Sequence, residues 1–271
     1  MPASCDILLK TKRALYKNCQ DSQELDSEMF RGLGTFGCEL RKISHLPASQ
    51  KMNGDTQMII DFHTHIFSKA VRENRRAKSR PGDMDDKAVL YAGLGIRAYL
   101  VVELHTPRGE LAFYQSGIDR ESRDRLRPVM DICLEKNLPV LIHTNEPVGH
   151  VYPGKTPNTL AQIYKLVQAF PENKIVLAHW GGGIFLFNLL RKEVRETLKN
   201  VWFDTAASPF LYRPEIYGIA KQLAGLDKIL LGTDFPLLKP ARYFKELEAA
   251  SISAEDREMI CGGNAASLLR R

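Results

Sequence analysis

Short apolar runs alternate with longer amphipathic segments along the chain from Met58 onward. Strands that alternate with helices in this way are typical of βα units around a parallel sheet. The pattern therefore predicts an α/β protein. The apolar runs predict six strands, at 58–62, 96–104, 138–142, 174–178, 201–203 and 228–231.

Apolar residues at helical spacing predict helices between these strands. Asn158 is the expected N-terminal cap of a helix that ends near Pro171. Ser253 and Asp256 resemble a variant capping box at the start of another. The remaining helices are predicted at 185–198, 214–223, 242–250 and 265–270.

The first 57 residues differ from the rest of the chain. They are polar and turn-rich, and their apolar residues follow neither the helix nor the strand period. We predict that 1–57 form an N-terminal extension that is poorly structured or peripheral, and that 58–271 form the main domain. The total of 271 residues would by itself allow one large domain or two small ones.

The composition, with 44% hydrophobic and 26% charged residues, is that of an ordinary soluble protein and excludes a disordered or fibrous chain. No apolar run approaches the roughly 18 residues that span a bilayer, and the start lacks a signal-peptide core. The five cysteines are scattered and contain no C-x-x-C pair, which predicts neither a disulfide framework nor a zinc knuckle. We therefore expect a cytoplasmic protein without a membrane partner.

The net charge of +6 is concentrated in one region, because +4 of it lies within 66–97. A basic stretch that binds nucleic acid usually combines clustered charge with aromatic residues for stacking. The run at 72–80 is locally basic but offers few aromatic residues. We interpret it as a solvated surface and expect no nucleic-acid partner.

Histidines and an aspartate follow several of the predicted strands directly. His63 and His65 end the first strand, and because strand side chains alternate they point to the same face. His143, His179 and Asp234 occupy the corresponding position after later strands. In a parallel barrel the carboxyl ends of all strands share one mouth, where active sites lie. Imidazole and carboxylate are ligands that zinc and similar divalent ions prefer, so a metal centre is favoured over separate core histidines and a helix-capping aspartate.

Three further features near the strand ends allow two interpretations each. Asp204 could orient substrate or a histidine, or cap the following helix. His150 and Lys155, in the polar loop 145–155, could bind a carboxylate or belong to a solvated loop. The glycines at 181–183 could form an anion cradle or only permit a tight turn. The sequence leaves these alternatives open.

Together these motifs resemble the amidohydrolase superfamily, in particular the amidohydrolase-related group that includes aminocarboxymuconate-semialdehyde decarboxylase-like enzymes. The resemblance covers 58–67 and runs without interruption from about 109 to 271. It includes nothing from 1–57. The motifs that carry it are His63-x-His65, His143, AHWGG at 178–182, GTDFP at 232–236 and GNAASLL at 263–269.

This resemblance implies a (β/α)₈ TIM-barrel fold of the metal-dependent hydrolase type, holding one or two divalent ions. Zinc is the first choice and manganese the second. His179 would be a second-site ligand or a substrate-facing catalytic residue. Glu110 resembles the fourth-strand position, where some relatives place a bridging group. The implied metal ligands are His63, His65, His143 and Asp234.

The chain departs from the family pattern in one region. About 30 residues, from 66 to about 95, cannot hold the second and third βα units in full. We therefore predict a barrel that is abbreviated or irregular around strands 2–3, with the N-terminal extension filling part of the gap.

The resulting hypothesis is a metal-dependent hydrolase of a small amide, lactone or ester. The metal lowers the pKa of a bound water, Asp234 takes its proton, and His179 polarises the substrate carbonyl. A first alternative is a metal-dependent decarboxylase of an aromatic or unsaturated acid, with the metal and Lys155 or Arg213 holding the carboxylate. A second alternative is a barrel remnant that no longer catalyses. A small-molecule substrate and a possible homo-oligomer accompany either enzyme.

Overall fold

The computed structural model describes residues 38–42, 59–64, 96–102, 111–152, 154–190, 192–235 and 237–269, and for 38–42 and 96–102 it describes the backbone alone. Two predicted site residues, His65 and Glu110, lie outside these ranges. The region 66–95, where we predict an abbreviated or irregular barrel, lies outside them too.

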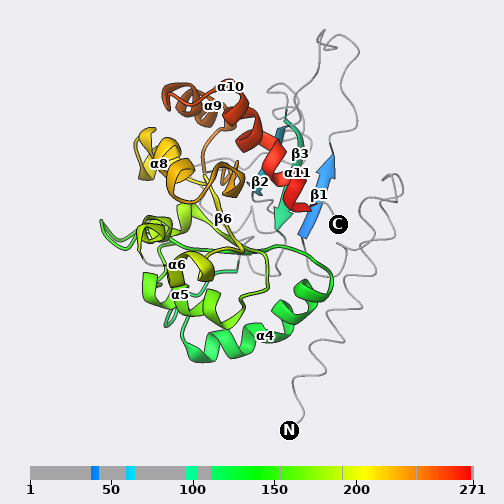
Figure 1. Ribbon diagram of the computed structural model, residues 1–271, viewed down its shortest axis with the longest axis vertical. Coiled ribbons are helices and arrows are strands. Elements are labelled where there is room, and N and C mark those ends of the chain that lie inside the picture. Colours follow the sequence, from blue (N-terminus) through cyan, green and yellow to red (C-terminus); the bar gives the residue numbers. More distant parts are fainter. Residues whose placement is uncertain are drawn as a thin grey trace, which may run out of the picture.

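The described strands form two sheets that adjoin each other (Figure 1). In the first, β1 (Cys38–Lys42) pairs antiparallel with β3 (Ile96–Val102), and β3 pairs parallel with β2 (Ile59–Thr64). The second is parallel throughout and has the order β4-β5-β6-β7. Its strands are β4 (Val140–Ile142), β5 (Ile175–Leu177), β6 (Val201–Asp204) and β7 (Ile229–Leu230).

Backbone contacts join the two sheets along β2 and β7. The amide of Phe62 donates to the carbonyl of Leu231 at 2.7 Å, and Thr64 forms a parallel bridge with Phe235. At the other edge, Leu111 forms a parallel bridge with Ile142 of β4. Strand β2, the first of the predicted βα series, therefore lies beside β7, the last described strand. The closing strands of a barrel are neighbours in the same way.

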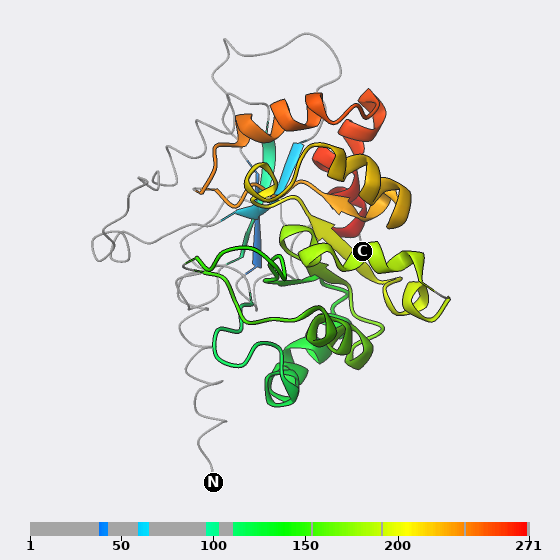
Figure 2. The same cartoon turned by 90° about the vertical axis from the view of Figure 1, so that its left-hand side faces the viewer.

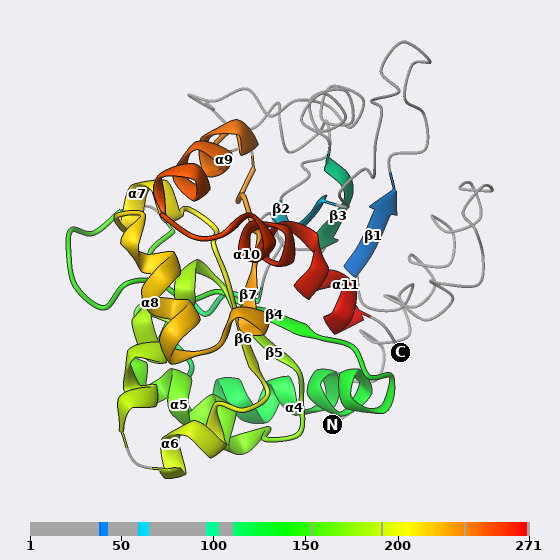
Figure 3. The same ribbon diagram turned by 45° about the horizontal axis from the view of Figure 1, so that its top comes forward.

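Helices surround the strands, and Figures 2 and 3 show them outside the parallel sheet. Among the described residues, no helix is long and apolar enough to cross a membrane. The helices are α4 (Arg120–Glu135), α5 (Leu160–Ala169), η2 (His179–Leu189), α6 (Lys192–Thr197), α7 (Ser208–Leu211), α8 (Glu215–Leu223), η3 (Leu226–Lys228), α9 (Pro240–Ala249), α10 (Ala254–Glu258), η4 (Met259–Gly263) and α11 (Asn264–Leu269).

The strands divide the buried apolar side chains between two clusters. In β5, Ile175 and Leu177 belong to the larger cluster, which packs the strands against the helices, while Val176 belongs to the smaller one. This alternation has the two-residue period of a strand. The smaller cluster includes Ala265 and Leu268 of α11, so the last helix packs against the strands.

All six predicted strands are confirmed, within two residues at each end. The predicted helix at 185–198 is wrong as one element, because Leu190 has extended backbone (ψ −176°) and separates η2 from α6. The cap predicted at Asn158 is also wrong. Thr159 caps α5 in a capping box with Gln162, while the Asn158 amide donates to the carbonyl of His143 at 3.1 Å.

Several described elements were not predicted: α4, the short helices α7, η3 and η4, and strand β1. Helix α4 contains Pro128 and many charged residues, which weakens its helical pattern, although Asp119 caps it by accepting from the Ser122 amide at 2.8 Å. Strand β1 lies within 1–57, so part of the predicted extension joins the sheet. The rest of 1–57 lies outside the described residues.

Candidate functional site

Polar side chains at the carboxyl ends of the strands converge in the structure. The ring centroids of His63 and His179 are 5.4 Å apart, and those of His143 and His179 are 5.0 Å apart. The Nε2 atom of His63 lies 3.8 Å from Oδ1 of Asp234. All four residues are at most 9% exposed. Four of the five side chains predicted to meet at one mouth therefore lie together, and the fifth, His65, lies outside the described residues.

His63 and Asp204 form a buried pair from β2 and β6. The Nδ1 atom of His63 donates to Oδ2 of Asp204 at 2.8 Å, and neither residue is exposed to solvent. A carboxylate can only accept, so the proton of neutral His63 lies on Nδ1 and its lone pair lies on Nε2. That lone pair is on the side of Asp234. This tautomer is the one that a metal-binding histidine requires.

Asp204 also organises the loops that follow β5 and β6. Its Oδ1 atom accepts from the backbone amides of His179 at 2.8 Å and Ala206 at 3.0 Å. It does not cap helix α7, whose N-cap is Ala207 without a side-chain bond. Of the roles considered for Asp204, the geometry matches the positioning of a histidine.

His179 begins a left-handed turn of five residues. His179 and Trp180 have φ of 55° and 61°, and the three glycines that follow have φ between 61° and 86°. Left-handed backbone is unfavourable for residues other than glycine. The His179 ring is held by its Nδ1, which donates to the carbonyl of Ala206 at 3.0 Å. The glycine run thus makes a tight turn that aims His179 at the other histidines.

Gly182 is required in this turn for a second reason. A Cβ atom there would lie 2.4 Å from the carbonyl oxygen of Asn145, and φ is +62°. We expect Gly182→Ala to lower the free energy of unfolding by about 2–4 kcal/mol. In Gly218→Ala, at an exposed position of helix α8, the added Cβ meets nothing within 4 Å, and we expect a gain of about 0.5–1 kcal/mol. Urea unfolding of both variants checks this, and equal midpoints would contradict it.

The loop after β7 is anchored to β2 on both sides of Asp234. The amide of Asp234 donates to the carbonyl of His63 at 2.9 Å. Fully buried Asp61 accepts from the Thr233 amide at 3.0 Å and from its hydroxyl at 2.6 Å. A Cβ on Gly232 would lie 2.7 Å from Cβ of His63, so glycine permits this approach. No role was predicted for Asp61, although a carboxylate inside an apolar strand was the available signal.

The loop after β4 is braced by an ion pair. Lys155 donates to Glu146 at 2.8 Å and to the carbonyls of Val148 at 3.0 Å and His150 at 3.3 Å. The hydroxyl of Tyr152 donates to Glu146 at 3.0 Å. Burial first, and then the charge of Glu146, raise the pKa of Tyr152. The ammonium group of Lys155 therefore has three partners within its own loop, and His150 is exposed.

Arg213 is exposed to solvent. Its side chain is 86% exposed and lies 3.8 Å from Glu215. The neighbouring Tyr212 is closer to the site, because its hydroxyl would be 3.7 Å from a Cβ on Gly183. Burial, and then the charge of Glu146, raise the pKa of Tyr212. Tyr212 and Glu146 were not singled out from the sequence, since only the fold brings the two loops together.

The donor types at the strand ends suit a divalent metal. Imidazole nitrogens with a carboxylate are the usual ligands of zinc, and manganese accepts the same set. In the described part of the chain alone, no group of three or more His, Cys, Asp or Glu residues is arranged to hold an ion. His65, the second histidine of the predicted pair, lies outside that part. The chemistry of the donors His63, His143 and Asp234 therefore fits a metal, while the described side chains alone do not form a complete set of ligands.

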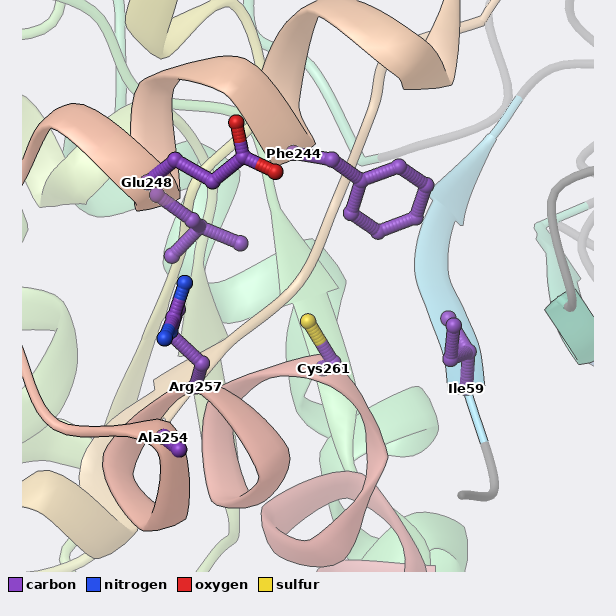
Figure 4. Close-up of a pocket in the computed structure, with 7 residues that line it drawn as sticks. Ile59, Phe244, Glu248, Ala254, Arg257 and Cys261 are labelled. Carbon is purple, nitrogen blue, oxygen red and sulfur yellow. The ribbon is translucent and has the colours of Figure 1, made fainter. Parts of the chain in front are cut away.

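A pocket of about 260 Å³ lies elsewhere, between the start of β2 and helices α9 and α10 (Figure 4). Its polar lining comes from Glu248 and Arg257, with the thiol of Cys261 at one side. Burial raises the pKa of that thiol to about 12, so it stays protonated at neutral pH. No histidine lines this pocket, and the strand-end cluster is the better candidate for chemistry.

Comparison with protein families gives one match. The family model described as Amidohydrolase matches residues 102–271. The match includes His143, His179 and Asp234, and β2 with His63 precedes it. No curated protein matches the chain.

Solved structures match at low sequence identity. A Pseudomonas putida protein, provisionally named a 2-pyrone-4,6-dicarboxylic acid hydrolase, is 16% identical over 79% of this chain and 97% of that one, with a TM-score of 0.55. A Staphylococcus aureus protein, provisionally named an amidohydrolase, is 16% identical over 78% and 99%, with a TM-score of 0.54. Together with the family match, these two similarities confirm the predicted fold class, an α/β TIM barrel.

A third structure covers less of the chain. It is a dihydroxybenzoic acid decarboxylase from Polaromonas sp. JS666 with bound manganese and the inhibitor 2-nitroresorcinol. It is 20% identical over 52% of this chain and 52% of that one, with a TM-score of 0.44. The chain thus spans about half the length of this decarboxylase.

Proposed function

The chain belongs to the amidohydrolase family, and from this premise we propose that it is a metal-dependent hydrolase of a small amide, lactone or ester. The observation that carries the proposal is the buried His63–Asp204 pair. It leaves Nε2 of His63 on the side of Asp234, 3.8 Å from Oδ1. This arrangement combines a histidine held in one tautomer with a carboxylate at the same strand ends. Such a combination is what a catalytic metal centre needs.

The ion would be held by His63, His143 and Asp234, together with His65. Zinc is the first choice and manganese the second, because both accept this mixture of nitrogen and oxygen ligands. When bound, the ion supplies Lewis acidity toward a carbonyl or water oxygen. The remaining chemistry falls to the protein's own side chains.

His179 and Asp234 are the proposed catalytic residues. The carbonyl of Ala206 can only accept, so Nδ1 of His179 carries a proton and Nε2 of the neutral ring carries the lone pair. Once Nε2 has taken a proton from solvent, the imidazolium donates a hydrogen bond to the substrate carbonyl oxygen and to the oxyanion that develops there, and it keeps that proton throughout. The carboxylate of Asp234 accepts the proton of the attacking water and passes it to the leaving group. The left-handed turn holds the His179 ring in place for its hydrogen bond to the substrate oxygen.

Hydrolysis is preferred to decarboxylation because of where two cations lie. In the decarboxylase hypothesis a cationic side chain helps the metal to hold the substrate carboxylate, and Lys155 and Arg213 were the candidates. Lys155 already binds Glu146 at 2.8 Å, so a substrate carboxylate would have to displace that partner. Arg213 is 86% exposed beside Glu215. The pairing of Lys155 and the exposure of Arg213 therefore favour hydrolysis.

Metal content tests the proposal. We expect the protein purified without chelator to hold about one or two equivalents of zinc or manganese, and His63→Ala to bind the metal at least about tenfold more weakly. His150→Ala is the matched control, because that histidine is exposed in a loop. A folded protein that holds no metal would favour the non-catalytic remnant. Loss of metal in both variants would contradict the role given to His63.

The reaction is then identified with the metal-loaded protein. We expect the protein to release a carboxylic acid from at least one member of a panel of lactones, amides and esters. A pH-stat measures the acid as it is released. Release of carbon dioxide from aromatic or unsaturated carboxylic acids, without hydrolysis of any panel member, would overturn hydrolysis in favour of decarboxylation.

A further inference from the structure

A buried carboxylate on α9 lies at the end of a hydrogen-bond chain that leads to the left-handed turn. Oε1 of Glu246 accepts from the hydroxyl of Ser208 at 3.1 Å, and that hydroxyl oxygen accepts from the indole Nε1 of Trp180 at 2.9 Å. Oε2 of Glu246 accepts from Tyr217 at 3.1 Å. Glu246 is 7% exposed, and the other three residues are fully buried. The hydrogen-bond chain therefore runs through the core from helix α9 to Trp180, the residue after His179.

The donor and acceptor roles in this chain follow from the chemistry of its ends. An indole can only donate, so Ser208 accepts from Trp180 and must place its own proton on another acceptor. The carboxylate of Glu246 is that acceptor. Both partners of Glu246 are hydroxyls rather than cations, and burial raises its pKa. Arg242 acts on Glu246 only as a weaker, longer-range charge. A buried carboxylate whose hydrogen-bond partners are both neutral is costly, which calls for a reason why this position holds one.

The turn that the chain reaches has to be held by its surroundings. His179 and Trp180 both have left-handed backbone, which side-chain-bearing residues adopt only when neighbouring contacts impose it. The backbone and ring of His179 bind Asp204 and Ala206. Trp180 is held by Ser208 and by a T-shaped ring contact with Tyr217, at 5.1 Å between centroids.

A second residue on the same face of α9 reaches the neighbouring loops. The hydroxyl of Tyr243 accepts from the amide of Ala207 at 2.9 Å and donates to the carbonyl of Thr233 at 2.7 Å. Ala207, like His179, has left-handed backbone, with φ of 57°. Tyr243 and Glu246 are three residues apart and so lie on one helix face. This face thus contacts the loops after β6 and β7, and through Ser208 the loop after β5.

We propose that Glu246 is a positioning residue that acts through Ser208 and Trp180 to hold the His179 ring in its place at the strand ends. The inference rests on the proposed function only in giving His179 a catalytic role. The hydrogen-bond partners of Glu246 are Ser208 and Tyr217, not the described strand-end histidines. Its effect is therefore expected on the geometry of His179 rather than on a proton-transfer step of its own.

Nuclear magnetic resonance of the full chain tests this without catalysis. In a Trp202→Phe background, Trp180 is the only tryptophan, so its indole N–H gives a single resonance. The ring nitrogen shifts of His179 are assigned by comparison with His179→Gln. We expect Ser208→Ala and Glu246→Ala to speed exchange of the indole proton by roughly tenfold and to shift the His179 ring resonances.

Two variants serve as matched controls. Glu246→Gln keeps an oxygen that accepts from Ser208 and offers an amide that can donate to Tyr217, so we expect both signals to stay at their parent values. Tyr217→Phe removes the hydrogen bond from the Tyr217 hydroxyl to Glu246 but keeps the ring against Trp180. We expect the indole and His179 signals to stay at their parent values in this variant too.

The proposal is overturned if Ser208→Ala alters the indole signal but leaves His179 unchanged, or if neither signal moves in the folded variants. It is also overturned if Glu246→Gln behaves like Glu246→Ala, because the chain would then depend on charge rather than on the acceptor. Neither signal depends on turnover, and each variant is compared with the parent at the same metal content. A failure of this inference can therefore be distinguished from a failure of the proposed hydrolase activity.

Discussion

Asp234→Asn is expected to lower turnover by about 10²–10⁴-fold while the protein stays folded. Asparagine cannot take a proton from water, so the proposed acid-base step loses its carrier. Folding is retained for two reasons. The residue has φ of 51°, and asparagine tolerates left-handed backbone about as well as aspartate. The hydrogen bond from its backbone amide to the carbonyl of His63 does not depend on the side chain.

Steady-state kinetics on the best substrate of the hydrolysis panel measures this effect, with urea unfolding of both proteins as the check on stability. Asp227→Asn is a suitable control, because it makes the same exchange at the opposite end of β7, in η3. If Asp234→Asn kept turnover within a few-fold of the parent, Asp234 would not be the proton carrier.

Asp204→Asn is expected to weaken metal binding by about 10–100-fold. The asparagine oxygen can still accept from the amides of His179 and Ala206, so the loops stay in place. Its amide group then faces Nδ1 of His63 and donates to it. Neutral His63 must in turn move its proton to Nε2, which removes the lone pair directed to the side of Asp234.

The matching experiment combines metal titration with the ¹⁵N spectrum of the histidine rings. The spectrum of the metal-free variant should show His63 in the opposite tautomer from the parent. Glu215→Asn alters an exposed carboxylate and should change neither measurement. Unchanged metal affinity in a variant whose tautomer had switched would show that His63 is not a ligand.

Asp204→Ala is expected to behave differently from the asparagine variant. It removes the acceptor of three buried donors, those of His63, His179 and Ala206. Each donor left without a partner costs about 1–3 kcal/mol. Since whole domains are stable by only about 5–15 kcal/mol, this variant should lose much of its stability. The contrast between the two substitutions separates the role of Asp204 in folding from its role in setting the tautomer.

Much of the fold and part of the site could be predicted from the sequence. The runs that become β4 and β5 end at His143 and His179, and the parallel arrangement of strands follows from their alternation with helices. Parallel strands share one edge at their carboxyl ends, so residues far apart in the chain were expected to meet there. The ring distances of His63 and His143 from His179 agree with that expectation.

Local hydrogen-bond competition was less predictable. Asn158 and Thr159 are both good capping residues, and the structure uses Thr159 because the Asn158 amide binds the backbone of His143 instead. In the same way, Lys155 was a candidate for binding a substrate carboxylate, but Glu146 in its own loop accepts from it. Such choices depend on which partner the folded backbone brings closer.

The sequence by itself determined which residue types follow the strands and hence the chemistry available to the site. Only the tertiary structure decided which of these side chains are partners. His63 and Asp204 are 141 residues apart in the chain, and Asp61 and Thr233 are 172 apart. Periodicity describes which face of an element a residue occupies, but it carries no information about which distant residue lies opposite. That information arises when the strands take their order and register, because a buried polar group must then be satisfied by whatever donor or acceptor the packing places beside it.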